Sequence, residues 1–176
     1  MEKAQNSWSV PIAADDIPEN GLHIETEAPA EVRAQLAKLA NLRDLPHLSA
    51  VFDLTRRGGG VHVAGQVRAR VVQTCVVTLD PIKSDLDEPV DLLFAPPRGT
   101  GTKNDGDGDR KTADEEPAEP LIEGKVDLGT VATEFLLLGI DPYPRKAGAE
   151  FVAVKADDDR AKPFAALETL KKRLGG

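Results

Sequence analysis

The chain has 176 residues, of which 40% are hydrophobic and only 4% aromatic, and its formal net charge is −8. A chain this negative repels the phosphate backbone, which excludes indiscriminate nucleic-acid binding and leaves only a local basic face for such contacts. No apolar run approaches the roughly 18–20 residues of a membrane span, and the N-terminus lacks the basic start and apolar block of a signal peptide. With one cysteine and no export signal, we expect a cytoplasmic protein that contacts no membrane.

The first part of the chain predicts short strands around a single helix. Apolar and polar residues alternate near Trp8, and Pro11 favours an edge strand there. Pro29 suits the first position of a helix, because its missing N–H would be unpaired there anyway. The pattern predicts a strand over 8–12, a second near 22–24, a helix over 29–40 and a third strand over 48–54.

The hydrophobic pattern of residues 61–94 predicts a hairpin with one apolar face. Before Asp80-Pro81 the apolar residues occupy mostly odd positions, and after it they occupy even positions. The first strand would overrun an ordinary sheet at about 3.3 Å per residue. We therefore expect it to bend, bulge or break at Gly65 or near Gln73.

The second part of the chain begins with a polar stretch. Residues 98–120 carry almost nothing apolar, so they cannot offset the entropy of ordering, and we expect a disordered acidic linker. Asp127 suits the N-cap of a helix over 128–138, and the apolar run 135–138 indicates that this helix is largely buried. The pattern also predicts brief strands at 121–122 and 150–154 and a terminal helix over 164–174.

Together these elements predict an α+β fold with a mainly antiparallel, strongly curved or barrel-like β-sheet and two or three helices. If the long strand is heavily twisted, it can serve two sheets or wrap around a small barrel. We expect residues 1–97 and 121–176 to form the two parts of a single domain, with the linker 98–120 between them.

The sequence gives no positive sign of catalysis, of a metal site or of a cofactor. Cys75 lies on the apolar side of its strand, which is typical of a buried thiol acting as a small hydrophobe. A thiol-dependent enzyme would need a histidine brought beside it, with His23, His47 and His62 as the choices. One cysteine and three histidines fall short of a structural zinc site. A calcium-loop spacing at Asp105, Asp107, Asp109 and Glu116 has Arg110 where the turn needs glycine.

The best surface signal is the polar side of the long strand, where His62, Gln66, Arg68 and Arg70 project together. Guanidinium forks suit phosphate contacts. The alternative is an ordinary solvated face that pairs with carboxylates across the hairpin, at Asp85, Asp87 or Asp91. Arg145 and Lys146 are candidates to extend a basic surface.

Two segments of the chain carry a recognisable pattern. The first is Gln73-Thr74-Cys75-Val76-Val77-Thr78-Leu79-Asp80-Pro81, and the second runs from Val126-Asp127-Leu128-Gly129 to Asp141-Pro142-Tyr143-Pro144-Arg145-Lys146. In their order and spacing they resemble the YceD family of large ribosomal RNA subunit accumulation proteins. The acidic linker between them also fits the layout of that family. Many members carry Cys-x-x-Cys in the first segment, whereas here the second cysteine is replaced by Thr78. No metal or redox role is therefore carried over.

The resemblance implies a non-enzymatic protein that is needed for 23S ribosomal RNA to be made or to persist. Its expected partner is a large-subunit ribosomal precursor, either the RNA or a basic ribosomal protein. Two other hypotheses remain: a thiol-dependent enzyme that uses Cys75, and a generic protein–protein adaptor without a ribosomal link.

Overall fold

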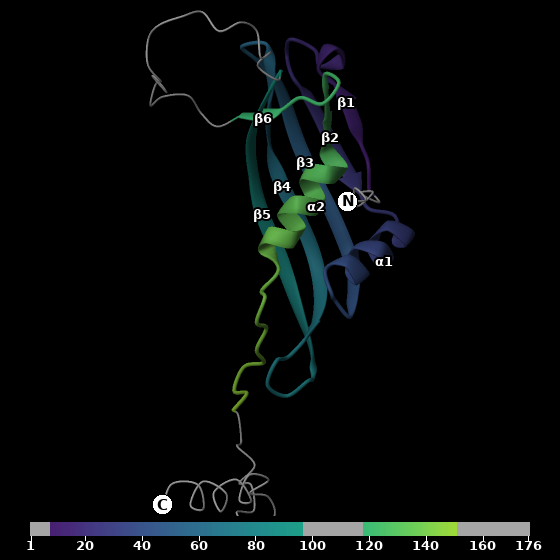
Figure 1. Cartoon of the computed structure of the whole chain (residues 1–176), viewed down its shortest axis with the longest axis vertical. Coiled ribbons are helices and arrows are strands. Elements are labelled where there is room, and N and C mark those ends of the chain that lie inside the picture. The colour runs from purple at the N-terminus through teal and green to yellow at the C-terminus, as the bar shows by residue number, and fades with distance from the viewer. Residues whose placement is uncertain (1–7, 97–117, 151–176) are drawn as a thin grey trace, which may run out of the picture. The chain divides into compact units, whose positions relative to one another are not determined.

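The computed structural model describes residues 8–96 and 118–150 (Figure 1). Contacts divide the chain into two units, Met1–Lys146 and Ala147–Gly176, and every element described below belongs to the first. The expected strand over 150–154 and helix over 164–174 lie outside the described residues apart from Glu150. The expectation of a single domain stays a prediction.

A mainly antiparallel five-stranded sheet forms the centre of the first unit, with strand order β2-β3-β4-β5-β6. Strands β2 to β5 pair antiparallel and β6 joins β5 in parallel. A separate pair is formed by β1 and β7. The strands are β1 (Pro11–Ala13), β2 (Leu22–Glu27), β3 (Asp44–Arg57), β4 (Gly60–Thr74), β5 (Pro81–Ala95), β6 (Ala118–Pro120) and β7 (Lys125–Asp127). The helices are α1 (Ala30–Leu39) and α2 (Leu128–Gly139), with a 3-10 turn at Ala14–Asp16.

The α+β class and the mainly antiparallel sheet are confirmed, but the barrel-like curvature is not. A barrel closes only when its first and last strands pair with each other. Here β2 pairs with β3 and β6 pairs with β5, so both remain edges of an open sheet. The long strand needs no second sheet, because β5 is equally long and pairs with it throughout.

Strand β4 ends at Thr74, next to the expected break at Gln73. No bulge occurs at Gly65, which pairs in regular register with β3 on one side and β5 on the other. The shift in register lies instead on β3, between Asp44 and His47. The hairpin therefore runs as one continuous ribbon from its Gly60 end to the turn before Pro81.

One face of the sheet is buried and carries both helices. Phe52 and Val63 are fully buried there, in one apolar cluster with Leu36 of α1 and Leu136 of α2. Helix α1 packs on β3, and α2 packs on β4 and β5 (Figure 1). The other face carries the alternate side chains, which are half-buried or exposed. This one-sided core is the arrangement that the alternating pattern predicts.

Two expectations for the second part of the chain need correction. Ala118–Pro120, placed in the linker by its polarity, forms strand β6, because its backbone pairs with the end of β5. The remainder of the linker lies outside the described residues. Helix α2 is buried over its first turns, but the expectation fails at its end, where Leu137 is 41% and Leu138 76% exposed. The helix packs against β4, β5 and β1, and the apolar run 135–138 reaches past this buried face.

Candidate functional site

The polar side chains on the open face of β4 lie beside carboxylates of β5. Arg70 Nε is 2.7 Å from an oxygen of Asp85, and Arg68 Nε is 3.4 Å from one of Asp87. His62 is 2.8 Å from Asp91, while Gln66 accepts a hydrogen bond from Arg68. This is the cross-hairpin pairing that the alternative interpretation expects. Exposed ion pairs of this kind contribute little to the stability of the fold. Their carboxylates nevertheless offset the positive charge that would otherwise attract a phosphate.

The Cys75 thiol is fully buried, as expected, although it lies outside the main apolar cluster. Its sulfur accepts hydrogen bonds from the backbone N–H groups of Thr78 and Lys146, both at 3.4 Å. Hydrogen bonding from Thr78, and then from Lys146, lowers the pKa of this thiol to about 6, while burial opposes the change. His62 is bonded to Asp91 near the opposite end of β4, roughly 40 Å away at strand rise.

We expect Cys75 to resist thiol reagents in the folded protein despite its lowered pKa, because a buried sulfur is closed to the reagent. Native protein mixed with a maleimide should label slowly, and protein in denaturant should label at once. The measurement is the mass shift against time. Rapid labelling of the native chain would favour the thiol-enzyme hypothesis instead.

The segment after α2 is bonded to the turn between β4 and β5. Gln73 Nε2 donates to the Asp141 carbonyl at 2.7 Å, and Val76 N–H donates to the Pro144 carbonyl at 3.0 Å. Lys146 adds an ion pair with Asp80 at 3.0 Å, besides its contact with the Cys75 sulfur. The two segments that resemble the family, far apart in sequence, therefore meet at one end of the hairpin.

This end of the hairpin exposes apolar side chains. Val76 is 47%, Leu79 68% and Tyr143 72% exposed. Tyr143 is held firmly: it lies between two prolines, its N–H donates to Asp141 Oδ1 at 2.8 Å, and the following Pro144 is buried. Proline fixes φ and so reduces the entropy that ordering would cost. A rigid, exposed aromatic ring is a ready stacking platform.

Two arginines near these apolar side chains form no ion pair with any described carboxylate. Arg43 donates to Thr74 Oγ1 at 2.8 Å and to the Leu79 carbonyl at 3.0 Å, which fixes its guanidinium, and its charge also acts on the Asp80 carboxylate. Arg145 is exposed and makes no ion pair within residues 8–96 and 118–150. We call this region the hairpin-end surface; it comprises Arg43, Val76, Leu79, Tyr143, Arg145 and Lys146.

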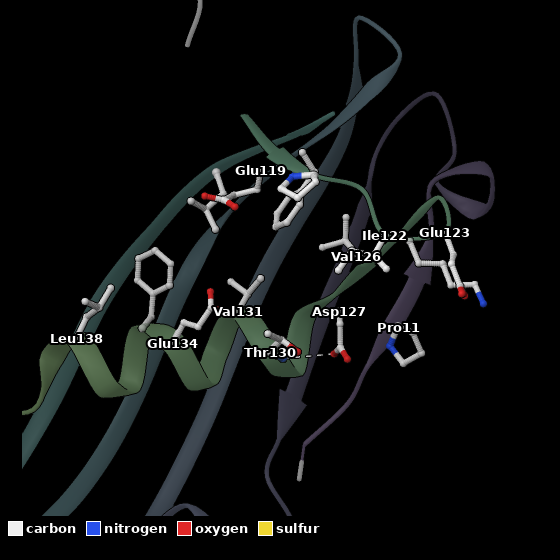
Figure 2. Close-up of a pocket in the computed structure, with 15 residues that line it drawn as sticks. Pro11, Glu119, Ile122, Glu123, Val126, Asp127, Thr130, Val131, Glu134 and Leu138 are labelled. Carbon is white, nitrogen blue, oxygen red and sulfur yellow. Dashed lines mark hydrogen bonds between the residues drawn. The ribbon is translucent and has the colours of Figure 1, made fainter. Parts of the chain in front are cut away.

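A groove of about 670 Å³ lies elsewhere on the unit, between α2 and strands β5, β6 and β7. Figure 2 shows Val131, Glu134 and Leu138 projecting from α2 into this region, with Glu119 across from them. Phe135 adds to its apolar lining. Burial, and then the charge of Glu119, raise the pKa of Glu134. We call this region the α2 groove.

The comparisons identify the family. Residues 63–171, more than half of the chain, match the family model described as large ribosomal RNA subunit accumulation protein YceD. The chain belongs to this family. No curated protein and no solved structure matches it.

The match contains both segments that form the hairpin end and also the helix that lines the groove. The family's description connects the chain with the large ribosomal subunit. Among the described residues, no cluster of histidine, cysteine and carboxylate side chains is placed to hold a metal ion. No helix in the same part of the chain is long and apolar enough to cross a membrane.

Sequence reasoning named Arg145 and Lys146 but missed their neighbours in space. Arg43 comes from the loop before β3, and its position is set by its backbone N–H bond to the Val72 carbonyl. Tyr143 carried a usable signal, because an aromatic residue between two prolines cannot bury itself in regular structure. Arg43 carried none, since only tertiary pairing brings it to the hairpin end.

Proposed function

We propose that this protein is a non-enzymatic ribosome-biogenesis factor that supports 23S ribosomal RNA accumulation by binding a large-subunit precursor. One observation carries the proposal: the two segments that resemble the family are bonded to each other at the hairpin-end surface. A surface assembled from the family's own signature segments is the natural place for the function that its members share.

We propose further that the hairpin-end surface contacts RNA. Unpaired nucleotides are held by stacking on aromatic rings and by arginine contacts to phosphates. Tyr143 supplies an exposed ring, and Arg43 and Arg145 supply guanidinium groups that form no ion pair with a carboxylate of the described residues. The Arg68 and Arg70 face is a weaker choice, because both guanidinium groups already contact carboxylates.

Binding is favoured over thiol catalysis by the environment of Cys75. A catalytic thiolate needs an open path to substrate and a base within hydrogen-bond reach. The sulfur here is fully buried, and it accepts hydrogen bonds from backbone N–H groups and from the Thr78 side chain, none of which is a base. The same bonds tie the turn to the segment after α2, which is a structural role for the thiol.

The test is depletion of the protein followed by complementation. Depletion should lower 23S relative to 16S RNA and leave precursor ends, and the wild-type chain should restore the ratio. The variant that combines Arg43→Glu with Arg145→Glu should fail to restore it, because the surface would then repel phosphate. The matched control, Arg68→Glu with Arg70→Glu, changes the net charge equally and should restore it. A normal ratio after depletion would refute the proposal.

Purified protein and a short oligouridine separate an RNA contact from a protein contact at this surface. Tyr143→Ala should lose about 1–3 kcal/mol of binding free energy, the usual worth of one stacked base. Tyr143→Phe should keep it, because the ring remains. If the oligomer does not bind although the double arginine variant fails in cells, the partner at this surface is a protein.

A further inference from the structure

The α2 groove has an apolar lining that the described residues leave open. Val131 is buried at its base, whereas Leu138 and Ile122 at its margins are 76% and 72% exposed. Val131, Glu134 and Leu138 stand at i, i+3 and i+7 on α2, so they share one side of the helix (Figure 2). An open apolar strip along a helix is the shape that accepts an amphipathic helix.

The charges beside this strip are mostly acidic. Glu119, Glu123 and Glu134 all line the groove, with Lys125 as its one cation among the described residues. Neither Glu119 nor Glu134 forms an ion pair within the described part of the chain. The raised pKa of Glu134 reflects this situation, since a partly buried carboxylate beside a second carboxylate resists ionisation.

We propose that the α2 groove is a docking site for a basic amphipathic helix of another protein. Leucine-like anchors of that helix would cover Val131, Phe135 and Leu138, and its lysine or arginine side chains would pair with Glu119 and Glu134. These cations would supply the positive charge that Glu119 and Glu134 do not receive from the described residues. Opposite charges around an apolar centre also select the partner and speed its encounter.

Other occupants fit less well. A second copy that used the same groove would bring two acidic rims together, because a two-fold interface places each patch against itself. The stretch between Pro96 and Ala118 has almost no apolar side chain to fill the groove and carries more acidic than basic residues. An enclosed pocket for a small molecule would bury its lining, whereas Leu138 and Ile122 are open to water.

The test uses the full chain and two labelled synthetic peptides. Both carry leucine at i, i+3, i+4 and i+7, with lysine at the remaining positions in one and glutamate in the other. Fluorescence anisotropy should show binding of the lysine peptide and none of the glutamate peptide. Leu138→Ser should weaken binding about tenfold. Leu39→Ser is the matched control, because Leu39 is 61% exposed on α1 and should leave the affinity unchanged.

Charge variants test whether Glu119 and Glu134 attract the peptide through direct contact or only through the net charge of the protein. The variant that combines Glu119→Lys with Glu134→Lys should lower the affinity for the lysine peptide by more than tenfold. The control that combines Glu19→Lys with Glu25→Lys changes the net charge equally and should lower this affinity less. Equal effects of the two pairs, or no effect of Leu138→Ser, would overturn the proposal. The proposal would also be overturned if the wild type were a dimer that Leu138→Ser converts to a monomer, because the occupant of the groove would then be a second copy of the chain. Peptide affinity is independent of the 23S readout, so this proposal and the proposed function can fail separately.

Discussion

Replacing Gly65 with alanine will lower the free energy of unfolding by about 3 kcal/mol, the upper part of the usual range for overpacking a core. A Cβ at this position would collide with the Val51 carbonyl oxygen and would lie 3.0 Å from Phe52 Cα. Both obstacles are backbone atoms of β3, so no side-chain rotation can relieve the contact. Because β4 is paired on both sides, it cannot move away from β3 without losing pairs with β5.

Urea unfolding followed by fluorescence measures this change. Trp8 is the only tryptophan and is 4% exposed in the folded chain, so its emission reports global unfolding. Ala64→Ser is the control, because Ala64 is the adjacent residue on the opposite face of β4 and is only half-buried. If Gly65→Ala unfolds within about 0.5 kcal/mol of the wild type, the strands have more freedom to separate than this geometry allows.

Gly65 shows where sequence reasoning reaches its limit. A glycine inside a strand pattern indicates either a bulge or a close approach of another backbone. The two cases look alike in sequence, because the residue that decides between them, Phe52, lies on another strand. The sequence therefore predicted that the position was unusual, and the structure shows that close approach, without a bulge, is the reason.

The hairpin itself was predictable because its information is local. The change of parity at Asp80-Pro81 puts Arg68 and Arg70 on the same face as Asp85, Asp87 and Asp91, and the observed register pairs Arg70 with Asp85 and Arg68 with Asp87. Whether the sheet is open or closed into a barrel was not predictable, because this depends on whether the edge strands β2 and β6 pair with each other. Likewise the hairpin-end surface joins a loop before β3, a turn after β4 and a segment after α2. Composition and periodicity carry no signal for such a meeting; only the resemblance to the family grouped two of the three.

Removal of the Asp127 carboxylate should cost about 3 kcal/mol, because it satisfies donors from two parts of the chain. Its oxygens accept hydrogen bonds from the N–H groups of Gly129 at 3.0 Å and Thr130 at 3.3 Å, which makes it the N-cap of α2, as the sequence predicted. They also accept from Ser9 Oγ at 2.6 Å and from Val10 N–H at 2.8 Å. Loss of the cap costs about 1 kcal/mol, and each further donor left without a partner adds about as much.

Asp127→Ala should therefore unfold at clearly lower urea than Asp127→Asn, which keeps a side-chain acceptor of the same shape. Equal stability of the two variants would show that the hydrogen bonds contribute little. The charge itself is tested by pH. Burial raises the pKa of Asp127, but the bonds from Ser9 and the three backbone N–H groups outweigh it, so the folded pKa lies below the ordinary value of 3.8.

A carboxylate with a depressed pKa stabilises the fold above its unfolded value and loses that contribution as the pH falls through the folded value. The wild type should thus exceed Asp127→Asn in stability at neutral pH, and the difference should shrink as the solution is acidified below about pH 4. If the stability difference between the wild type and Asp127→Asn stays constant below about pH 4, the negative charge of Asp127 does not strengthen its four hydrogen bonds. In that case the cap would act as a neutral acceptor, and α2 would owe its position mainly to the apolar contacts of Leu128 and Leu136 with the sheet.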